Sequence, residues 1–224
     1  MMRWWWRLAT TLIRVGGAAA WQLRAYGVEN IPRTGGVLLA ANHQSFLDPP
    51  LVGSCLPREM HFMARKTLFR NPLFGALIGR CNAFPIERDT ADVKGVKEAI
   101  ARLQAGNLLL VFPEGTRTRD GSIGRMKPGI GVLAERAAVP IVPVLIDGAY
   151  KVWPKDRSLP GRGRIRIVFG QPMSGVPESG MTAGDRIRDA IVGLKETWRT
   201  GRRPGDEEAG GSRHDVPGSS PSLR

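Results

Sequence analysis

The sequence predicts an α/β protein with a mostly parallel central sheet that is flanked by helices. Short apolar runs, bounded by Gly, Pro or charged residues, alternate along the chain with segments of helical periodicity. Several of these runs are apolar at every position, which is typical of strands that are buried on both faces of a parallel sheet. Regular alternation of strands and helices produces the crossover connections that such a sheet needs.

Six apolar runs predict the strands. The first, "GVLLAA", is bounded by glycines, and "NLLLVF" has no polar position after its first residue. The last, "GRIRIVFG", alternates with period two and therefore predicts a half-exposed strand. The expected strands cover residues 36–41, 60–65, 83–88, 107–112, 140–147 and 163–170.

Caps and apolar spacing predict the helices between these strands. Asp48 before two prolines, and Asn71 before one, provide an N-cap and a first helical turn. Gly106 ends a segment with apolar residues at helical spacing. The expected helices cover residues 48–56, 71–80, 90–106, 129–138 and 185–199.

Residues 1–27 predict one further, amphipathic helix. At 100° per residue, three arginines and Thr10 fall on one narrow face, and apolar residues fall on the opposite face. Arginines opposite tryptophan and leucine favour a helix that lies in a membrane interface. The longest uncharged run, 15–23, is nine residues and too short to span a bilayer. The alternative is an ordinary amphipathic helix packed on the domain. The apolar face holds Trp5, Leu8, Leu12, Ala19 and Leu23.

We therefore expect three parts: an interfacial helix (1–27), one folded domain (28–199) and a disordered tail (200–224). The tail is rich in Gly, Pro, Ser and charges, a composition that cannot build a core. The expected location is peripheral or monotopic, on the cytoplasmic face of the cell membrane.

The formal net charge of +13 lies in the folded part, because the tail's four arginines balance its four acids. Such a surplus attracts nucleic acid, anionic lipid or phosphorylated substrates. Tryptophans gathered at the N-terminus and only two tyrosines in the chain argue against stacking on bases, so we expect no nucleic acid partner. The basic segment 150–166, around Trp153, predicts contact with an anionic membrane surface, with an exposed basic loop as the alternative. Cys55 and Cys81 belong to no Cys/His cluster, so no metal site is expected.

"NHQSFLD" directly follows the first strand and predicts a catalytic base. Asp48 can accept a hydrogen bond from one nitrogen of His43, which leaves the other nitrogen able to take a proton. The alternative is a locally bonded histidine, with Asp48 as a helix cap. The chain has no G-x-S-x-G elbow, so we expect the nucleophile to come from the substrate.

"FPEGTR" follows a second strand and predicts an anion site on the same rim of the sheet. Gly115 allows close backbone approach, Thr116 offers a hydroxyl, and Arg117 offers a forked guanidinium that matches phosphate. A solvated loop with arginines is the alternative interpretation.

Together these motifs resemble the glycerolipid acyltransferases. "NHQSFLD" is similar to their NHxxxxD motif, and "FPEGTR" is similar to their EGTR motif, whose Glu114 lies 71 residues after His43. "AFPIER" and "VPIVPV" resemble the second and fourth motifs of the family. One departure is Asn82, where the family has a glycine; asparagine also tolerates a left-handed backbone.

The resemblance implies transfer of an acyl group from acyl-CoA or acyl carrier protein to the free hydroxyl of lysophosphatidate, forming phosphatidate, without a cofactor. His43 would deprotonate the hydroxyl, Asp48 would orient His43, and Asn42 would position the loop or contact substrate. The implied phosphate-binding residues are Lys66, Arg88, Glu114, Gly115, Thr116 and Arg117.

Two other functions stay open at this point. The acceptor could be glycerol 3-phosphate, a lysophospholipid or an acylated amino acid, because these relatives share the His/Asp motif. A non-catalytic, basic membrane-binding protein is the alternative from another class, and the intact pair of His43 and Asp48 argues against it.

Overall fold

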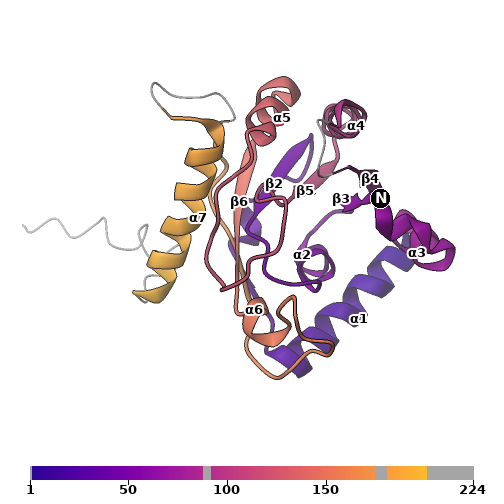
Figure 1. Ribbon diagram of the computed structural model, residues 1–224, viewed down its shortest axis with the longest axis vertical. Helices are drawn as coiled ribbons and strands as arrows, with labels where there is room; N and C mark the ends of the chain where they lie inside the picture. The colour runs from indigo at the N-terminus through magenta and orange to yellow at the C-terminus, as the bar shows by residue number, and fades with distance from the viewer. Residues whose placement is uncertain (1, 88–91, 175–180, 201–224) are drawn as a thin grey trace, which may run out of the picture.

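The computed structural model describes residues 2–87, 92–174 and 181–200, and in these the apolar runs form one sheet of seven strands (Figure 1). Their order across the sheet is β1-β7-β6-β2-β5-β3-β4. Neighbouring strands pair in parallel, except for β6 and β7, which are antiparallel. The strands are β1 (Arg24–Tyr26), β2 (Val37–Ala41), β3 (Met60–Arg65), β4 (Ala83–Ile86), β5 (Leu108–Val111), β6 (Ile141–Asp147) and β7 (Arg166–Phe169).

Helices cover both faces of the sheet, as the sequence predicts. One apolar core lies between the sheet and α1 and α2, and a second lies between the sheet and α4, α5 and α7 (Figure 1). Leu38 and Leu39 of β2 are both fully buried and point into opposite cores, which explains why this strand has no polar position. The helices are α1 (Trp4–Trp21), α2 (Asp48–Cys55), α3 (Pro72–Arg80), α4 (Val93–Gln104), α5 (Gly129–Ala137), α6 (Ala149–Val152) and α7 (Ala183–Arg199), with 3-10 turns at Val28–Asn30 and Lys66–Arg70.

The expectation of a half-exposed last strand is wrong. Ile167, Val168 and Phe169 of β7 are buried to within 1% exposure. They are covered because both faces of β7 carry a core: Ile167 and Phe169 pack into one, and Val168 packs into the other. Residues 24–26, which we assigned to the end of the N-terminal helix, form this edge strand instead.

The N-terminal helix packs on the domain and also keeps an exposed apolar face. Trp6 is buried in the core, and buried Gly17 lies against Leu51 of α2. On another side of the helix, a row of large apolar side chains is exposed. We call this row the apolar stripe of α1; it consists of Trp4 (77% exposed), Leu8 (53%), Leu12 (63%) and Val15 (62%). Among the described residues, no helix is long and apolar enough to cross a membrane.

Asn82 shows how the chain accommodates its departure from the family's glycine. Its backbone adopts the left-handed conformation, with φ of 63°. Its side-chain oxygen accepts a hydrogen bond from Arg3 Nη2 (2.7 Å), and Arg3 also donates to Glu59 Oε2 (2.6 Å). This network ties the start of α1 to the far edge of the sheet.

His61 provides a test of stability against pH. Burial, together with the positive charge of Arg102, lowers the pKa of His61 to about 4. The unfolded chain, with an imidazole pKa of ~6.5, binds a proton that the folded chain excludes. Stability is therefore lost as the pH falls from ~6.5 to about 4. We expect His61→Gln, which keeps an acceptor for Arg102 Nη1 (2.7 Å from His61 Nδ1), to lose less melting temperature over this window than the wild type. If the melting temperatures of the two proteins fall by the same amount over this pH window, the assignment to His61 is wrong.

Candidate active site

His43 and Asp48 form a bonded pair beyond the end of β2, at the centre of the sheet. His43 Nδ1 lies 2.8 Å from Asp48 Oδ2, and both residues are buried. The same carboxylate oxygen accepts hydrogen bonds from the backbone N–H groups of Gln44 (2.6 Å) and Ser45 (2.8 Å). Three donors converging on Oδ2 fix the carboxylate, so His43 donates from Nδ1 and carries its basic lone pair on Nε2.

The expected N-cap role of Asp48 is wrong. Asp48 is the first residue of α2, Leu47 precedes the helix, and no side chain caps it. The carboxylate accepts from the N–H groups of Gln44 and Ser45 instead, because Pro49 and Pro50, which follow Asp48 in the first helical turn, have no N–H to donate. Asp48 therefore organises the loop that carries the base.

Phe112 contacts the base directly, and we did not predict this. Its ring stacks on the imidazole of His43, with 3.9 Å between ring centroids and 17° between ring planes. Phe112 is the first residue of "FPEGTR" and follows β5, the neighbour of β2, so parallel pairing brings it beside His43. The stack fixes the plane of the imidazole, in addition to the bond from Asp48.

Glu114 positions His43, and its carboxylate is occupied by backbone donors. Oε1 accepts from the N–H of His43 (3.0 Å), and Oε2 accepts from the N–H of Gly124 (3.1 Å). Burial raises the pKa of Glu114, while these two hydrogen bonds oppose that rise. A carboxylate with both oxygens engaged in this way is a poor ligand for a phosphate. The geometry therefore assigns Glu114 a positioning role.

Asn42 also makes structural contacts. Its amide donates to the carbonyl of Ile146 (2.9 Å) and accepts from the N–H of the same residue (2.7 Å). It is buried and joins the end of β2 to β6 across 104 residues of sequence. A positioning role therefore fits Asn42 better than contact with substrate.

Arg117, the last residue of "FPEGTR", packs against the loop that carries His43. Its guanidinium carbon lies 3.5 Å from the centroid of Phe46, a ring in the loop between His43 and Asp48. Nη1 is buried and has no hydrogen-bond partner among the described residues. Burial lowers the pKa of Arg117, and the negative charges of Asp48 and Asp156 oppose that shift. A buried, unpartnered guanidinium nitrogen beside the base is a ready site for an anionic oxygen.

The other predicted anion-binding residues lie at different places on the rim. Gly115 has φ of 72°, and an added Cβ would lie 2.5 Å from the side chain of Lys127, so this position requires glycine. Thr116 is exposed beside it. Lys66 follows β3 and forms an ion pair with Glu87 (2.5 Å), and both side chains are largely exposed. Arg88 lies outside the described residues.

A third segment completes the surroundings of the base. Ser45 Oγ donates to the carbonyl of Trp153 (2.8 Å), and the side-chain oxygen of Gln44 accepts from the N–H of Tyr150 (3.1 Å). Tyr150 Oη in turn donates to the carbonyl of Arg119 (2.6 Å). These contacts lock "NHQSFLD", the loop after β5 and α6 into one unit. We missed α6, whose four residues carry too weak a periodic signal.

Residues 22–147, more than half of the chain, match the family model described as Acyltransferase. The chain belongs to the acyltransferase family. It is therefore an O-acyltransferase, as the two motifs predict.

Solved and curated relatives agree with this membership. The crystal structure of PlsC, the 1-acyl-sn-glycerophosphate acyltransferase of Thermotoga maritima, superposes with a TM-score of 0.72 at 26% identity and covers 86% of this chain and 81% of that one. The 1-acyl-sn-glycerol-3-phosphate acyltransferase of Bacillus subtilis is 28% identical over 175 residues, which are 78% of this chain and 85% of the relative. The chloroplastic enzyme LPAT1 of Arabidopsis thaliana is also 28% identical, but this chain spans only 44% of its length.

Exchanging Glu114 for glutamine tests its positioning role. The glutamine oxygen can accept only one of the two backbone N–H groups. Its NH₂ group then points at the other N–H, of His43 or Gly124, and two donors oppose each other. We expect kcat to fall roughly 10- to 100-fold, because displacing the base by about 1 Å is enough for such a loss. The KM for the acceptor should change little. Glu135→Gln, on the exposed side of α5, is the matched control and should behave as wild type. A rise confined to the acceptor KM would return Glu114 to the phosphate site.

Proposed function

We propose that this acyltransferase moves a fatty acyl group from acyl-CoA or acyl carrier protein to the free hydroxyl of 1-acylglycerol 3-phosphate, forming phosphatidate in phospholipid biosynthesis. The observation that carries the proposal is the placement of the base beside a cation: His43, bonded to Asp48, lies in one unit with the unpartnered guanidinium nitrogen of Arg117. A reacting hydroxyl and a phosphate on one small molecule fit this arrangement. The names of the relatives point to the same acceptor.

The geometry supports a direct transfer. His43 Nε2 accepts the hydroxyl proton as the hydroxyl oxygen attacks the thioester carbonyl, forming the new C–O bond. The imidazolium that forms is stabilised by the buried carboxylate of Asp48, 2.8 Å from Nδ1. When the intermediate collapses, the C–S bond breaks, and the leaving thiolate, whose conjugate thiol has a pKa of ~8.5, takes the proton from Nε2. The scheme needs no metal or cofactor besides the acyl donor.

We also propose that the enzyme works as a peripheral or monotopic protein on the cytoplasmic face of the cell membrane. The apolar stripe of α1 supports this, because four large apolar side chains lie exposed along one helix face. An acceptor with one long acyl chain resides in a bilayer, so an enzyme held at the interface meets it there.

A thiol-release assay tests the reaction and its acceptor together. The purified chain is mixed with palmitoyl-CoA, alone and with lysophosphatidate, glycerol 3-phosphate or lysophosphatidylcholine. We expect free thiol to appear rapidly with lysophosphatidate and slowly with the others. Equal rates with lysophosphatidylcholine would contradict phosphate recognition, and equal rates without any acceptor would make the protein a thioester hydrolase.

Arg117→Lys tests the phosphate contact. Lysine keeps the charge but loses the planar fork and the stack on Phe46. We expect the KM for lysophosphatidate to rise roughly tenfold, because one charge-assisted hydrogen bond contributes about that much to binding. The KM for palmitoyl-CoA should change little. Arg119→Lys, two residues further on and exposed, is the matched control. Equal increases in both KM values would remove Arg117 from the acceptor site.

A further inference from the structure

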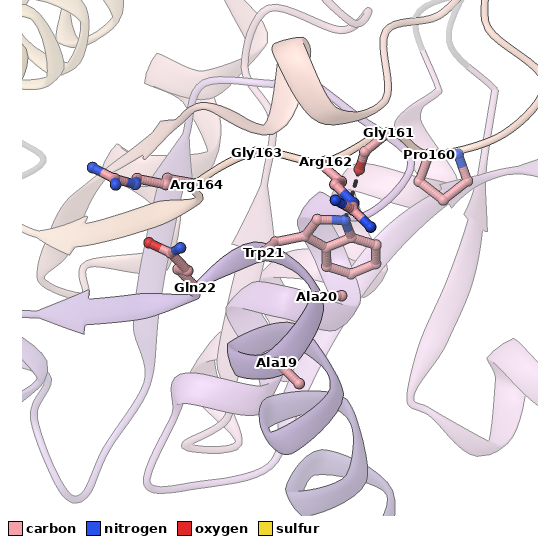
Figure 2. A pocket seen from close by; sticks show the side chains of 9 residues that line it. All are labelled: Ala19, Ala20, Trp21, Gln22, Pro160, Gly161, Arg162, Gly163 and Arg164. Atoms are coloured by element: carbon pink, nitrogen blue, oxygen red, sulfur yellow. Dashed lines mark hydrogen bonds between the residues drawn. The ribbon is translucent and has the colours of Figure 1, made fainter.

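A hollow at the C-terminal end of α1 lies outside the catalytic unit. Its volume is about 790 Å³, and it opens to the surface between the last turn of α1 and the segment before β7 (Figure 2). None of its lining residues belongs to the "NHQSFLD" or "FPEGTR" motifs. We call it the α1-end hollow; it is lined by Ala19, Ala20, Trp21, Gln22 and residues 160–164.

Two hydrogen bonds join the walls of the hollow, and a third holds one wall to α6. The indole Nε1 of Trp21 donates to the carbonyl of Gly161 (3.0 Å), the dashed line in Figure 2. The carbonyl of Trp21 accepts from the N–H of Ile165 (2.9 Å), and the N–H of Gly161 donates to the carbonyl of Val152 (2.7 Å). The site is therefore formed before any ligand arrives, which lowers the entropy cost of binding.

The charge of the hollow is positive. Its two charged side chains are Arg162, which lies beside the Trp21 ring in Figure 2, and Arg164, further along the same segment. Both are exposed, and neither forms an ion pair within the described part of the chain. The C-terminal end of a helix carries about half a negative charge. Two full positive charges outweigh it, and the Ile165 N–H already occupies the carbonyl of Trp21.

The apolar stripe of α1 leads directly to this hollow. Successive stripe residues are separated by four, four and three positions, and four positions after Val15 comes Ala19, the first lining residue. Ala19 therefore lies on the helix face that carries the stripe. Trp21 also lines the hollow, and tryptophan is a residue that prefers the membrane interface. Apolar side chains next to two arginines match the boundary of a bilayer, where the acyl chains of a phospholipid meet its phosphate.

We propose that the α1-end hollow binds the headgroup phosphate of an anionic membrane phospholipid, while the apolar stripe of α1 contacts the acyl chains below the headgroups. This site is separate from the acceptor site at Arg117 and does not depend on which acceptor the enzyme uses. The bound lipid fixes the depth and rotation of α1 at the bilayer surface. A soluble acidic partner such as acyl carrier protein would explain the arginines but not why they lie at the end of the apolar stripe.

Vesicle co-sedimentation of the full chain tests the proposal. The vesicles are phosphatidylcholine alone and phosphatidylcholine mixed with phosphatidylglycerol. Each basic residue at an anionic surface contributes about fivefold to partitioning, so Arg162→Gln/Arg164→Gln should bind the mixed vesicles roughly 30-fold less well than wild type. Binding to phosphatidylcholine alone should be unchanged. Lys97→Gln/Arg136→Gln removes the same charge from exposed positions on α4 and α5 and should change binding no more than about twofold.

A second pair of variants separates the hollow from the helix surface around it. Ala20→Glu places a carboxylate inside the hollow, and Ala18→Glu places one on the same helix outside it; both alanines are exposed. We expect Ala20→Glu alone to reproduce the loss on mixed vesicles. Equal losses for the two glutamate variants, or for the two double variants, would mean that net charge acts without a site and would overturn the proposal.

Assays of the catalytic reaction provide a folding control and a test of the alternative partner. With palmitoyl-CoA and a short-chain, water-soluble lysophosphatidate, all four variants should turn over as wild type, which shows that they fold. If Arg162→Gln/Arg164→Gln binds mixed vesicles normally but reacts poorly only with acyl carrier protein as donor, the hollow is a protein-docking site and the lipid proposal is wrong. Failure of the proposed acceptor in the thiol-release assay would leave the vesicle result untouched.

Discussion

Replacing His43 with alanine should lower kcat by about 10²- to 10⁴-fold, the usual contribution of a general base, and should leave the KM values for donor and acceptor nearly unchanged. The base acts when the hydroxyl proton moves, so its loss appears in the chemical step. Phe112 and the loop around the imidazole remain, held by the bonds from Asp48 to Gln44 and Ser45. Steady-state kinetics with palmitoyl-CoA and lysophosphatidate, beside a melting curve, measure the effect.

Asp48→Asn isolates the charge of the orienting carboxylate. Asp48 Oδ2 already receives two backbone N–H groups, so the asparagine should place its oxygen there and its NH₂ at Oδ1, which has no partner among the described residues. His43 can then still donate from Nδ1, but the imidazolium loses its counter-charge. We expect a smaller loss in kcat than for His43→Ala.

The double variant decides whether the two residues act as one unit. His43→Ala/Asp48→Asn should be barely slower than His43→Ala, because a carboxylate has no imidazole left to orient. If the two losses multiply, Asp48 contributes independently of His43, and the base-and-orienter mechanism is wrong.

Leu8→Glu/Leu12→Glu should release the enzyme from membranes. The two side chains are 53% and 63% exposed, so the substitutions leave the core intact and should not change the melting temperature. A leucine buried in an apolar medium contributes about 1.5–3 kcal/mol, so losing two should weaken vesicle binding by at least about 100-fold. Flotation of the full chain with vesicles measures this.

Thr11→Glu/Ala18→Glu is the control for charge. These positions are exposed, lie between the arginine face and the apolar stripe of α1, and receive the same two carboxylates. This control should float with the vesicles. Normal recovery of Leu8→Glu/Leu12→Glu would place the membrane contact elsewhere on the molecule.

Local signals predicted the regular elements well. The structure places β3 at the expected residues 60–65, and α3 begins after Asn71, whose side chain accepts from the N–H of Phe74. A strand pattern or an N-cap acts within a few residues and is therefore visible in sequence. β1 is different: its three residues form a strand because they pair with β7, about 140 positions later, and nothing in "RAY" indicates that partner.

The active site was also only partly predictable from sequence. The motifs identified His43, Asp48 and Arg117 as neighbours on one rim, because parallel strands end at the same edge. Their contacts depend on tertiary structure. Sequence alone could not tell that Glu114 bonds to the backbone of His43 or that Phe112 stacks on its ring, since both pairs lie about 70 residues apart.

The position of β2 in the sheet also constrains how the nascent chain matures. Its two neighbours are β5 and β6, so the catalytic strand is completed only after residue 147 has been synthesised. The bond between Asn42 and Ile146 closes a loop of 104 residues, and such long-range closure is slow. The apolar stripe of α1 leaves the ribosome more than a hundred residues earlier. A growing chain therefore exposes the apolar stripe before the strand that carries its catalytic base can complete its pairing in the sheet.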